Sequence, residues 1–313
     1  MENKMVDLSI VIPVYNEEKN IPILYNKLNE VIQSLKLSYE IVFADDGSKD
    51  NTIRNIEALQ DKDNKVKLIQ FRKNFGKSYA LYEGFKNATG KIIITMDGDL
   101  QDDPNEIPRF LEAIKNYDVV VGWKFRRKDP LTKTIPSKIA NYTNRKATKL
   151  SIHDMNCGFK AYKSEAAKSL KLYGDMHRYI PALLAEKGFK VGEIKITHHK
   201  RKYGKSKYGF GRLSRGLFDF MTIRFLTNYS NRPLHFFGGI GIALGTIGFL
   251  MELYALYLKV FLGELFLTHI SLIIFGFILI LMGLQLISIG LLGEMIVKNN
   301  NVTNYEVKRK IGF

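Results

Sequence analysis

The chain has a single cysteine among its 313 residues, Cys157, so it has no intrachain disulfide framework and suits a reducing compartment. Acidic residues are also scarce: 31 aspartates and glutamates stand against 47 lysines and arginines, a formal net charge of +16. Such a charge suits a polyanionic partner. Because no recognisable nucleic-acid motif is present, we expect phosphorylated substrates and anionic membrane lipids as partners, and no nucleic acid.

Long hydrophobic runs are missing from the first two-thirds of the chain and lie between about Leu234 and Val297. Two spans, Leu234–Leu258 and Ile270–Ile296, are each long enough to cross a hydrocarbon core of about 30 Å. Few charges lie between the spans, whereas lysines and arginines flank their other ends, so both termini are expected in the cytoplasm. The polar segment Met1–Asp7 contains no cleavable signal. We therefore expect a multi-pass protein of the cytoplasmic membrane.

The composition divides the chain into four parts. We expect a globular cytoplasmic domain over residues 1–208, amphipathic interfacial helices over 209–232, two transmembrane helices over 233–298 and a cytoplasmic tail over 299–313. The amphipathic part mixes arginines with large apolar side chains between Gly209 and Tyr229, which is typical of a helix in the membrane interface. A helix in a tertiary core is the alternative for this part.

Short apolar runs alternate with amphipathic segments over residues 1–125, which indicates a βαβ arrangement with a parallel sheet. The expected strands are Leu8–Pro13, Glu40–Asp45, Val66–Phe71, Lys91–Met96 and Asp118–Gly122, followed later by Gly158–Tyr162 and Lys190–Thr197. The expected helices are Asn20–Leu35, Asn51–Gln60, Lys77–Ala88, Pro104–Lys115 and Ser137–Leu150. In such sheets ligands bind beyond the carboxyl ends of the strands, so the loops after these strands are where chemistry is expected.

Asp97, Gly98 and Asp99 directly follow one expected strand. Residues two apart on an extended chain face the same way, so both carboxylates could approach one cation. Hard oxygen ligands of this kind suit Mg²⁺ or Mn²⁺ bridging to substrate phosphates, and Gln101 could join them. A solvated acidic turn is the ordinary alternative for an isolated pair of aspartates. The residues of the neighbouring loops are therefore needed to distinguish a metal site from such a turn.

Two neighbouring strand ends supply that context. The first expected strand runs into Pro13, Tyr15 and Glu17, and the second into Asp45 and Asp46. An aromatic ring, a glutamate and a pair of aspartates could stack on, and hydrogen-bond, a nucleobase and ribose. The residues after Asp46 are equally compatible with a plain turn and helix cap.

Together these segments resemble a known family. The chain contains, in order, IPVYNE, DDGSKDNT, DGDLQDDP, DMNCGFKAY and HHKRKYGKSKYG. This order resembles family 2 glycosyltransferases of the dolichyl-phosphate mannose synthase type, and the tandem spans that end in GLLGE resemble its bacterial undecaprenyl-phosphate branch. The resemblance covers nearly the whole chain. It implies an α/β fold with a GT-A (Rossmann-like) catalytic domain and a C-terminal two-helix transmembrane hairpin.

The resemblance also implies a reaction: inverting transfer of a sugar from a UDP- or GDP-linked donor to polyprenyl (undecaprenyl or dolichyl) phosphate at the cytoplasmic membrane face. The product would serve cell-envelope glycan or glycolipid modification. A processive polysaccharide synthase shares the early motifs, but its usual Gln-x-x-Arg-Trp segment is absent, and Trp123 is the only tryptophan. A non-catalytic membrane scaffold is a further alternative, and a homo-oligomer is left open.

Each matched residue acquires an expected role from the resemblance. The nucleotide-sugar would be bound by Pro13, Tyr15, Glu17, Asp45, Asp46, Asp97 and Gly98. The metal, Mg²⁺ or Mn²⁺, would be held by Asp97, Asp99 and Gln101. Acceptor and diphosphate would be bound by Lys124, Arg127, Ser137, Arg201 and Lys207. The expected catalytic residues are Asp154 and Asp99.

Some of these residues have a plainer alternative. Lys124 stands where the family usually has arginine, so it keeps the charge but loses the bidentate fork. Asp154 would orient or deprotonate the acceptor phosphate, and a structural aspartate is its alternative. Arg201 and Lys207 lie in a cationic loop that could close over both substrates and exclude water, or could simply contact lipid headgroups. Cys157 is expected to be a packed residue rather than a nucleophile.

Overall fold

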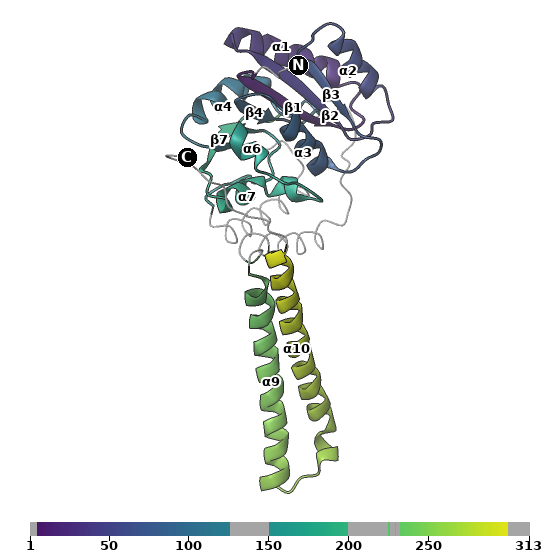
Figure 1. Ribbon diagram of the computed structural model, residues 1–313, viewed down its shortest axis with the longest axis vertical. Helices are drawn as coiled ribbons and strands as arrows, with labels where there is room; N and C mark the ends of the chain where they lie inside the picture. The colour runs from purple at the N-terminus through teal and green to yellow at the C-terminus, as the bar shows by residue number, and fades with distance from the viewer. Residues whose placement is uncertain (1–4, 126–149, 200–224, 226–228, 230–231, 300–313) are drawn as a thin grey trace. The chain divides into compact units, whose positions relative to one another are not determined.

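The computed structural model describes residues 5–125, 150–199, 225, 229 and 232–299 (Figure 1). The chain divides into two compact units, Met1–Phe220 and Met221–Phe313. The helix expected at Ser137–Leu150 lies almost entirely outside the described residues, as does most of the expected interfacial segment. The two units are described one at a time below.

The first unit is built on a seven-stranded sheet with the order β3-β2-β1-β4-β6-β5-β7. Its strands are β1 (Leu8–Val14), β2 (Tyr39–Asp45), β3 (Val66–Gln70), β4 (Ile92–Thr95), β5 (Val119–Lys124), β6 (Lys160–Lys163) and β7 (Val191–Ile196). Every residue of β2 and all but one of β1 are buried, as expected for strands covered on both faces. All the expected strands are present, with ends shifted by one or two residues.

The parallel arrangement predicted for the early strands is confirmed for β1 to β4, but the sheet is mixed. Strand β6 runs antiparallel between β4 and β5, with Ile93 opposite Tyr162 and Val120 opposite Ala161. The hydrophobic period of a segment predicts a strand but carries no information on its direction or neighbours. The direction of β6 therefore could not be predicted from the sequence.

Helices cover both faces of this sheet (Figure 1). They are α1 (Ile21–Leu35), α2 (Thr52–Gln60), α3 (Lys77–Asn87), the 3₁₀ turn η1 (Pro104–Glu106), α4 (Ile107–Ala113), α6 (Ser164–Lys168), η2 (Met176–Arg178) and α7 (Ile180–Glu186). Helix α1 buries Ile21, Leu24, Leu28 and Ile32, a spacing of three to four residues that forms one apolar stripe. The helix expected at Pro104–Lys115 is divided into η1 and α4, with Pro108 in the first turn of α4, where proline is tolerated.

The second unit contains two long helices, α9 (Pro233–Phe261) and α10 (Ile270–Asn299), joined through the short 3₁₀ turn η3 (Phe266–His269). They lie side by side, and glycines let their backbones touch (Figure 1). A Cβ atom at Gly241 would lie 2.6 Å from the carbonyl oxygen of Gly283, and one at Gly283 would lie 2.5 Å from that of Gly241.

Both helices are long and apolar enough to cross a membrane, as predicted from the sequence. Only 17% of the most apolar stretch of α9 and 11% of that of α10 is buried, whereas the core helices of a soluble domain are mostly buried. The chain is therefore a membrane protein.

Candidate active site

The strand order reverses between β1 and β4, since β1 leads to β2 on one side and pairs with β4 on the other. In an open α/β sheet this reversal leaves a crevice outside the carboxyl ends of the strands, where ligands bind. The loops after β1, β2 and β4 all emerge there.

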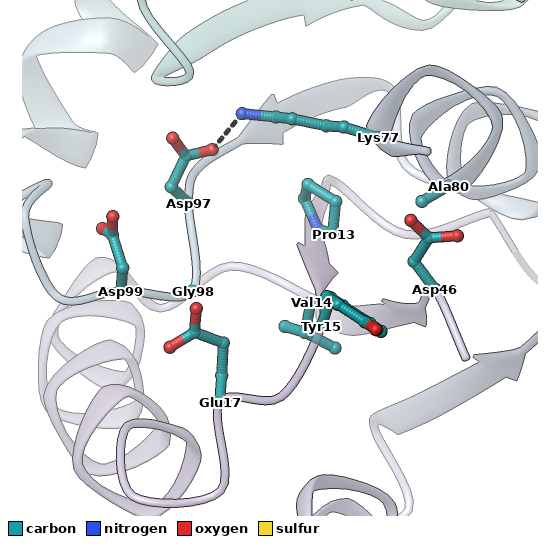
Figure 2. Close-up of a pocket in the computed structure, with 10 residues that line it drawn as sticks. All are labelled: Pro13, Val14, Tyr15, Glu17, Asp46, Lys77, Ala80, Asp97, Gly98 and Asp99. Atoms are coloured by element: carbon teal, nitrogen blue, oxygen red, sulfur yellow. Dashed lines mark hydrogen bonds and ion pairs between the residues drawn. The ribbon is translucent and has the colours of Figure 1, made fainter. Parts of the chain in front are cut away.

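A pocket occupies this position (Figure 2). Its lining residues are Pro13, Val14, Tyr15, Glu17, Asp46, Lys77, Ala80, Asp97, Gly98 and Asp99. The structure thus brings together most of the residues predicted to bind the nucleotide-sugar. Asp45, Gln101, Lys124 and Asp154 do not line this pocket. Arg127, Ser137, Arg201 and Lys207 lie outside the described residues.

The loops after β1 and β2 are tied to each other. Asn16, between Tyr15 and Glu17, has a left-handed φ of 52°, a conformation that asparagine adopts more readily than most residues. Its backbone N–H donates to Ser48 Oγ at 2.8 Å, and its Oδ1 accepts from the Lys49 N–H at 2.8 Å. These bonds fix the backbone that presents Tyr15 and Glu17 to the pocket.

The two aspartates at the end of β2 have different surroundings. Asp45 is fully buried, and its Oδ2 accepts from the Gly47 N–H at 3.1 Å, which shapes the turn rather than the pocket wall. Asp46 lines the pocket and accepts backbone N–H bonds from Phe75 at 2.7 Å and from Gly76 at 2.9 Å. Asp46 therefore joins the β2 loop to the start of α3.

Asp97 is surrounded by positive charge. Lys77 Nζ, at the start of α3, lies 2.5 Å from Asp97 Oδ1 (Figure 2). Burial alone would raise the pKa of Asp97, but Lys77, Lys124 and Lys160 hold it well below its ordinary value. Gly158 provides the space for this carboxylate, since a Cβ atom there would lie 2.5 Å from Asp97 Oδ1. Asp97 is consequently an ionised carboxylate packed against Gly158, just before β6.

Asp99 completes the carboxylate pair. Its Oδ1 accepts from the Gln101 N–H at 3.1 Å across Leu100, whose left-handed φ of 63° is unusual for leucine. The Gln101 side chain donates to the His199 carbonyl at 3.4 Å and does not line the pocket. The local turn, not an extended chain, sets the direction of these side chains.

The donor set of Asp97 and Asp99 suits a divalent metal. Within the part of the chain that the structure describes, no group of three or more His, Cys, Asp or Glu side chains is arranged to hold an ion. Two carboxylates nevertheless fit Mg²⁺ or a similar hard cation, which usually takes one or two protein carboxylates and completes its shell with water and substrate phosphate oxygens. The residues present fit such an ion only together with a phosphorylated substrate.

Lys124 is engaged behind the pocket. Its side chain is 12% exposed, and its Nζ lies 3.0 Å from Oδ1 of the buried Asp102. Burial would lower the pKa of Lys124, but Asp102 raises it above its ordinary value. The other Asp102 oxygen accepts from the Asp97 N–H at 3.3 Å. Lys124 thus supports the loop that bears Asp97, a contact that the sequence did not predict.

Asp154 lies in a buried turn next to β6 and is 2% exposed. Its carbonyl accepts from the Cys157 N–H at 3.2 Å, and the Lys160 ammonium donates to the Cys157 carbonyl. Beside this turn, the His153 ring stacks on Trp123 with centroids 4.0 Å apart. Cys157 is 2% exposed and belongs to the hydrophobic core, so it is a packed residue, as predicted, and burial raises the pKa of its thiol to about 12.

The sequence interpretation missed Lys77, the cation that lines the pocket. One local signal was available. Lys77 begins α3 directly after Gly76, and a cation at a helix N-terminus is unfavourable because the helix dipole is positive there. A lysine at such a position indicates that another charge stabilises it.

Comparison with known proteins places this architecture in a family. Residues 9–171 match the model of the family described as glycosyl transferase family 2. A dodecaprenyl-phosphate galacturonate synthase from Rhizobium johnstonii is 37% identical over 94% of this chain and 88% of its own length. An undecaprenyl-phosphate 4-deoxy-4-formamido-L-arabinose transferase from Pseudomonas paraeruginosa is 33% identical over 92% of this chain and 85% of its own length.

A solved structure agrees at the level of the fold. Glucosyl-3-phosphoglycerate synthase from Mycobacterium tuberculosis, crystallised with Mn²⁺, uridine diphosphate and phosphoglyceric acid, superposes with a TM-score of 0.55 at 15% identity. The match covers 72% of this chain and 81% of that one. The fold is that of a GT-A glycosyltransferase, as the sequence predicted. The chain belongs to glycosyl transferase family 2 and is a glycosyltransferase.

Proposed function

We propose that this enzyme transfers a sugar from a nucleotide-sugar to a polyprenyl phosphate at the cytoplasmic face of the membrane. The observation that carries the proposal is the pocket at the β1/β4 reversal, whose walls combine Tyr15, Glu17 and Asp46 with the Asp97 and Asp99 carboxylates. Support for the acceptor comes from two relatives, named as dodecaprenyl-phosphate and undecaprenyl-phosphate enzymes, that match nearly the whole chain.

The donor would lie with its nucleoside against the β1 and β2 loops and its diphosphate toward Asp97. Asp97 and Asp99, with Gln101 recruited from its contact with His199, would hold Mg²⁺ or Mn²⁺. Such an ion neutralises the charge that develops on a departing diphosphate. A protein of the same fold, the mycobacterial synthase, was crystallised with Mn²⁺ and uridine diphosphate, which supports a divalent metal here. Either a UDP-linked or a GDP-linked sugar would be compatible with the pocket residues.

The reaction would be a single displacement. An oxygen of the lipid phosphate attacks the anomeric carbon, the bond from that carbon to the diphosphate oxygen breaks, and the nucleoside diphosphate leaves with the bonding electrons. Attack opposite the leaving group inverts the anomeric configuration. Asp154 would orient the acceptor, which is already anionic and needs no strong base. Arg127, Ser137, Arg201 and Lys207 would bind the two phosphate-bearing substrates, with Lys124 acting through Asp102.

The membrane hairpin would hold the enzyme where its lipid acceptor lies. With both termini in the cytoplasm, helices α9 and α10 would cross the bilayer as a pair, and the net charge of +16 would favour anionic headgroups. The catalytic domain over 1–208, the interfacial segment over 209–232 and the tail over 299–313 complete the proposed division.

A product assay tests the proposal. The full-length protein, in phospholipid nanodiscs containing undecaprenyl phosphate and Mn²⁺ or Mg²⁺, would be incubated separately with each of a panel of UDP- and GDP-sugars. We expect one donor to give a lipid heavier than the acceptor by one sugar residue, and an Asp99→Asn variant to give none. A polymer free of lipid phosphate would instead identify a processive synthase, and no product with any donor would contradict the proposal.

A further inference from the structure

The Asp97 carboxylate is paired with Lys77 and is also a proposed metal ligand. Asp97 Oδ1 lies 2.5 Å from Lys77 Nζ, and both residues line the pocket (Figure 2). Their side chains are 28% and 30% exposed, so water screens the pair only in part. Of the three lysines that act on Asp97, Lys77 is the one that lines the pocket, while Lys124 is paired with Asp102 and Lys160 donates to the Cys157 carbonyl.

A divalent ion bound by Asp97 and Asp99 would have to lie close to the Lys77 ammonium. Two positive groups would then share the charge of one carboxylate, and their mutual repulsion is large at such distances unless water or a counter-charge intervenes. The metal would either displace the ammonium from Asp97 or bind against its charge. In both cases Lys77 weakens the binding of metal alone.

A donor diphosphate changes this balance. It would bring negative oxygens into the pocket, and a lysine ammonium is a compact point charge on a flexible stem that suits phosphate. Lys77 is anchored at the start of α3, at the edge of the pocket, so its side chain can turn from Asp97 toward such a ligand without a change in the backbone.

We propose that Lys77 couples the binding of metal to the binding of donor: its ammonium competes with a divalent cation for Asp97, and the donor diphosphate relieves the competition by taking the ammonium as its own counter-charge. This inference rests on the donor and metal sites of the proposed function. Because coupling between two ligands is reciprocal, the metal must strengthen donor binding by the same factor. Metal and donor therefore load as a pair, and neither alone fills the pocket tightly.

Binding of Mn²⁺, measured from the electron paramagnetic resonance signal of the free ion, tests the coupling without any turnover. The full-length protein in phosphatidylcholine nanodiscs would be titrated with Mn²⁺ alone, and again with saturating UDP or GDP, after correction for binding by the free nucleotide. The variants are Lys77→Gln, which removes the charge, and Lys77→Arg, which keeps it. Lys91→Gln is the matched control, since Lys91 pairs with Asp7 at 2.9 Å on the far end of β4.

We expect Mn²⁺ alone to bind Lys77→Gln about tenfold more tightly than the wild type, because one positive charge has left the site. The gain in Mn²⁺ affinity that the nucleotide produces should shrink by a similar factor in this variant. Lys77→Arg and Lys91→Gln should both behave like the wild type. Thermal unfolding of each variant establishes that the proteins compared are folded.

The inference is overturned if Mn²⁺ alone binds Lys77→Gln no more tightly than the wild type, or if the nucleotide enhances Mn²⁺ binding equally in both. A wild type that binds no Mn²⁺ with or without nucleotide would instead remove the metal from the proposed function, and the coupling with it. Weak wild-type binding that neither nucleotide strengthens would contradict the coupling while leaving the metal site in place.

Discussion

Gly158 offers a direct test of how closely the turn after Asp154 is packed against the loop that bears Asp97. The Cβ atom of an alanine at this position would lie 2.5 Å from Asp97 Oδ1 and 2.7 Å from its Cγ. The carboxylate would have to move by about 0.9 Å to restore an ordinary van der Waals contact. Gly158 does not have a left-handed φ, so alanine itself introduces no backbone strain.

The expected consequence is a loss of activity without a matching loss of stability. A misplacement of about 1 Å near the reacting centre can cost on the order of 100-fold in rate. We expect Gly158→Ala to lower kcat for glycolipid formation by about that factor and to weaken Mn²⁺ binding. Its free energy of unfolding should change by less than about 1 kcal/mol, since the displaced group is a side-chain end.

The assay compares kcat at saturating donor, together with urea unfolding, for Gly158→Ala and for Gly239→Ala. Gly239 is the control because a Cβ atom there would meet nothing within 4 Å. A kcat for Gly158→Ala within about twofold of the wild type would show that the Asp97 carboxylate does not need its observed position. That result would refute the packing argument.

Three further changes test other parts of the structure. Glu40→Gln should lower the free energy of unfolding by about 2 kcal/mol in urea titrations, less than for a fully buried pair because its partner Lys67 is 42% exposed. Burial lowers the pKa of His177 to about 2 from an ordinary 6.5, so only the unfolded chain takes up the proton below pH 6.5. The free energy of unfolding of the wild type should therefore decrease as the pH is lowered below 6.5, by up to about 1.4 kcal/mol per pH unit. Between pH 7 and pH 5, His177→Gln should not show this part of the decrease. Gly241→Leu should lower the Tm of the protein in nanodiscs, because its side chain would meet the Gly283 carbonyl, whereas Gly239→Leu should not.

Much of the pocket could be predicted because it depends on strand ends. Tyr15, Asp46 and Asp97 are far apart in the sequence, but each follows a strand of one parallel sheet, and the carboxyl ends of such strands meet at one edge. Recognising the strands was therefore enough to expect these residues together. The two membrane helices could be predicted for a different reason, because their length and composition are local properties.

The remaining features depend on contacts that no local pattern contains. The partnership of Lys77 with Asp97 requires α3, which packs on β1 and β2, to begin near the loop that follows β4. The partnership of Lys124 with Asp102 requires β5 to end near the same loop. Lys124 was expected at a phosphate because it stands where the resembled family usually has an arginine, and its buried partner Asp102 could not be recognised from the sequence. The antiparallel direction of β6 was hidden for the same reason, since pairing is a property of the whole sheet.

The most direct test of the account varies the acceptor and the metal together. Full-length protein in nanodiscs would receive its preferred nucleotide-sugar with either undecaprenyl phosphate or undecaprenol, each with EDTA and then with excess Mn²⁺, and the glycolipid formed would be measured by mass spectrometry. The account predicts product only with the phosphate, none with EDTA, and recovery on adding Mn²⁺. Equal transfer to undecaprenol, or full activity in EDTA, would contradict it.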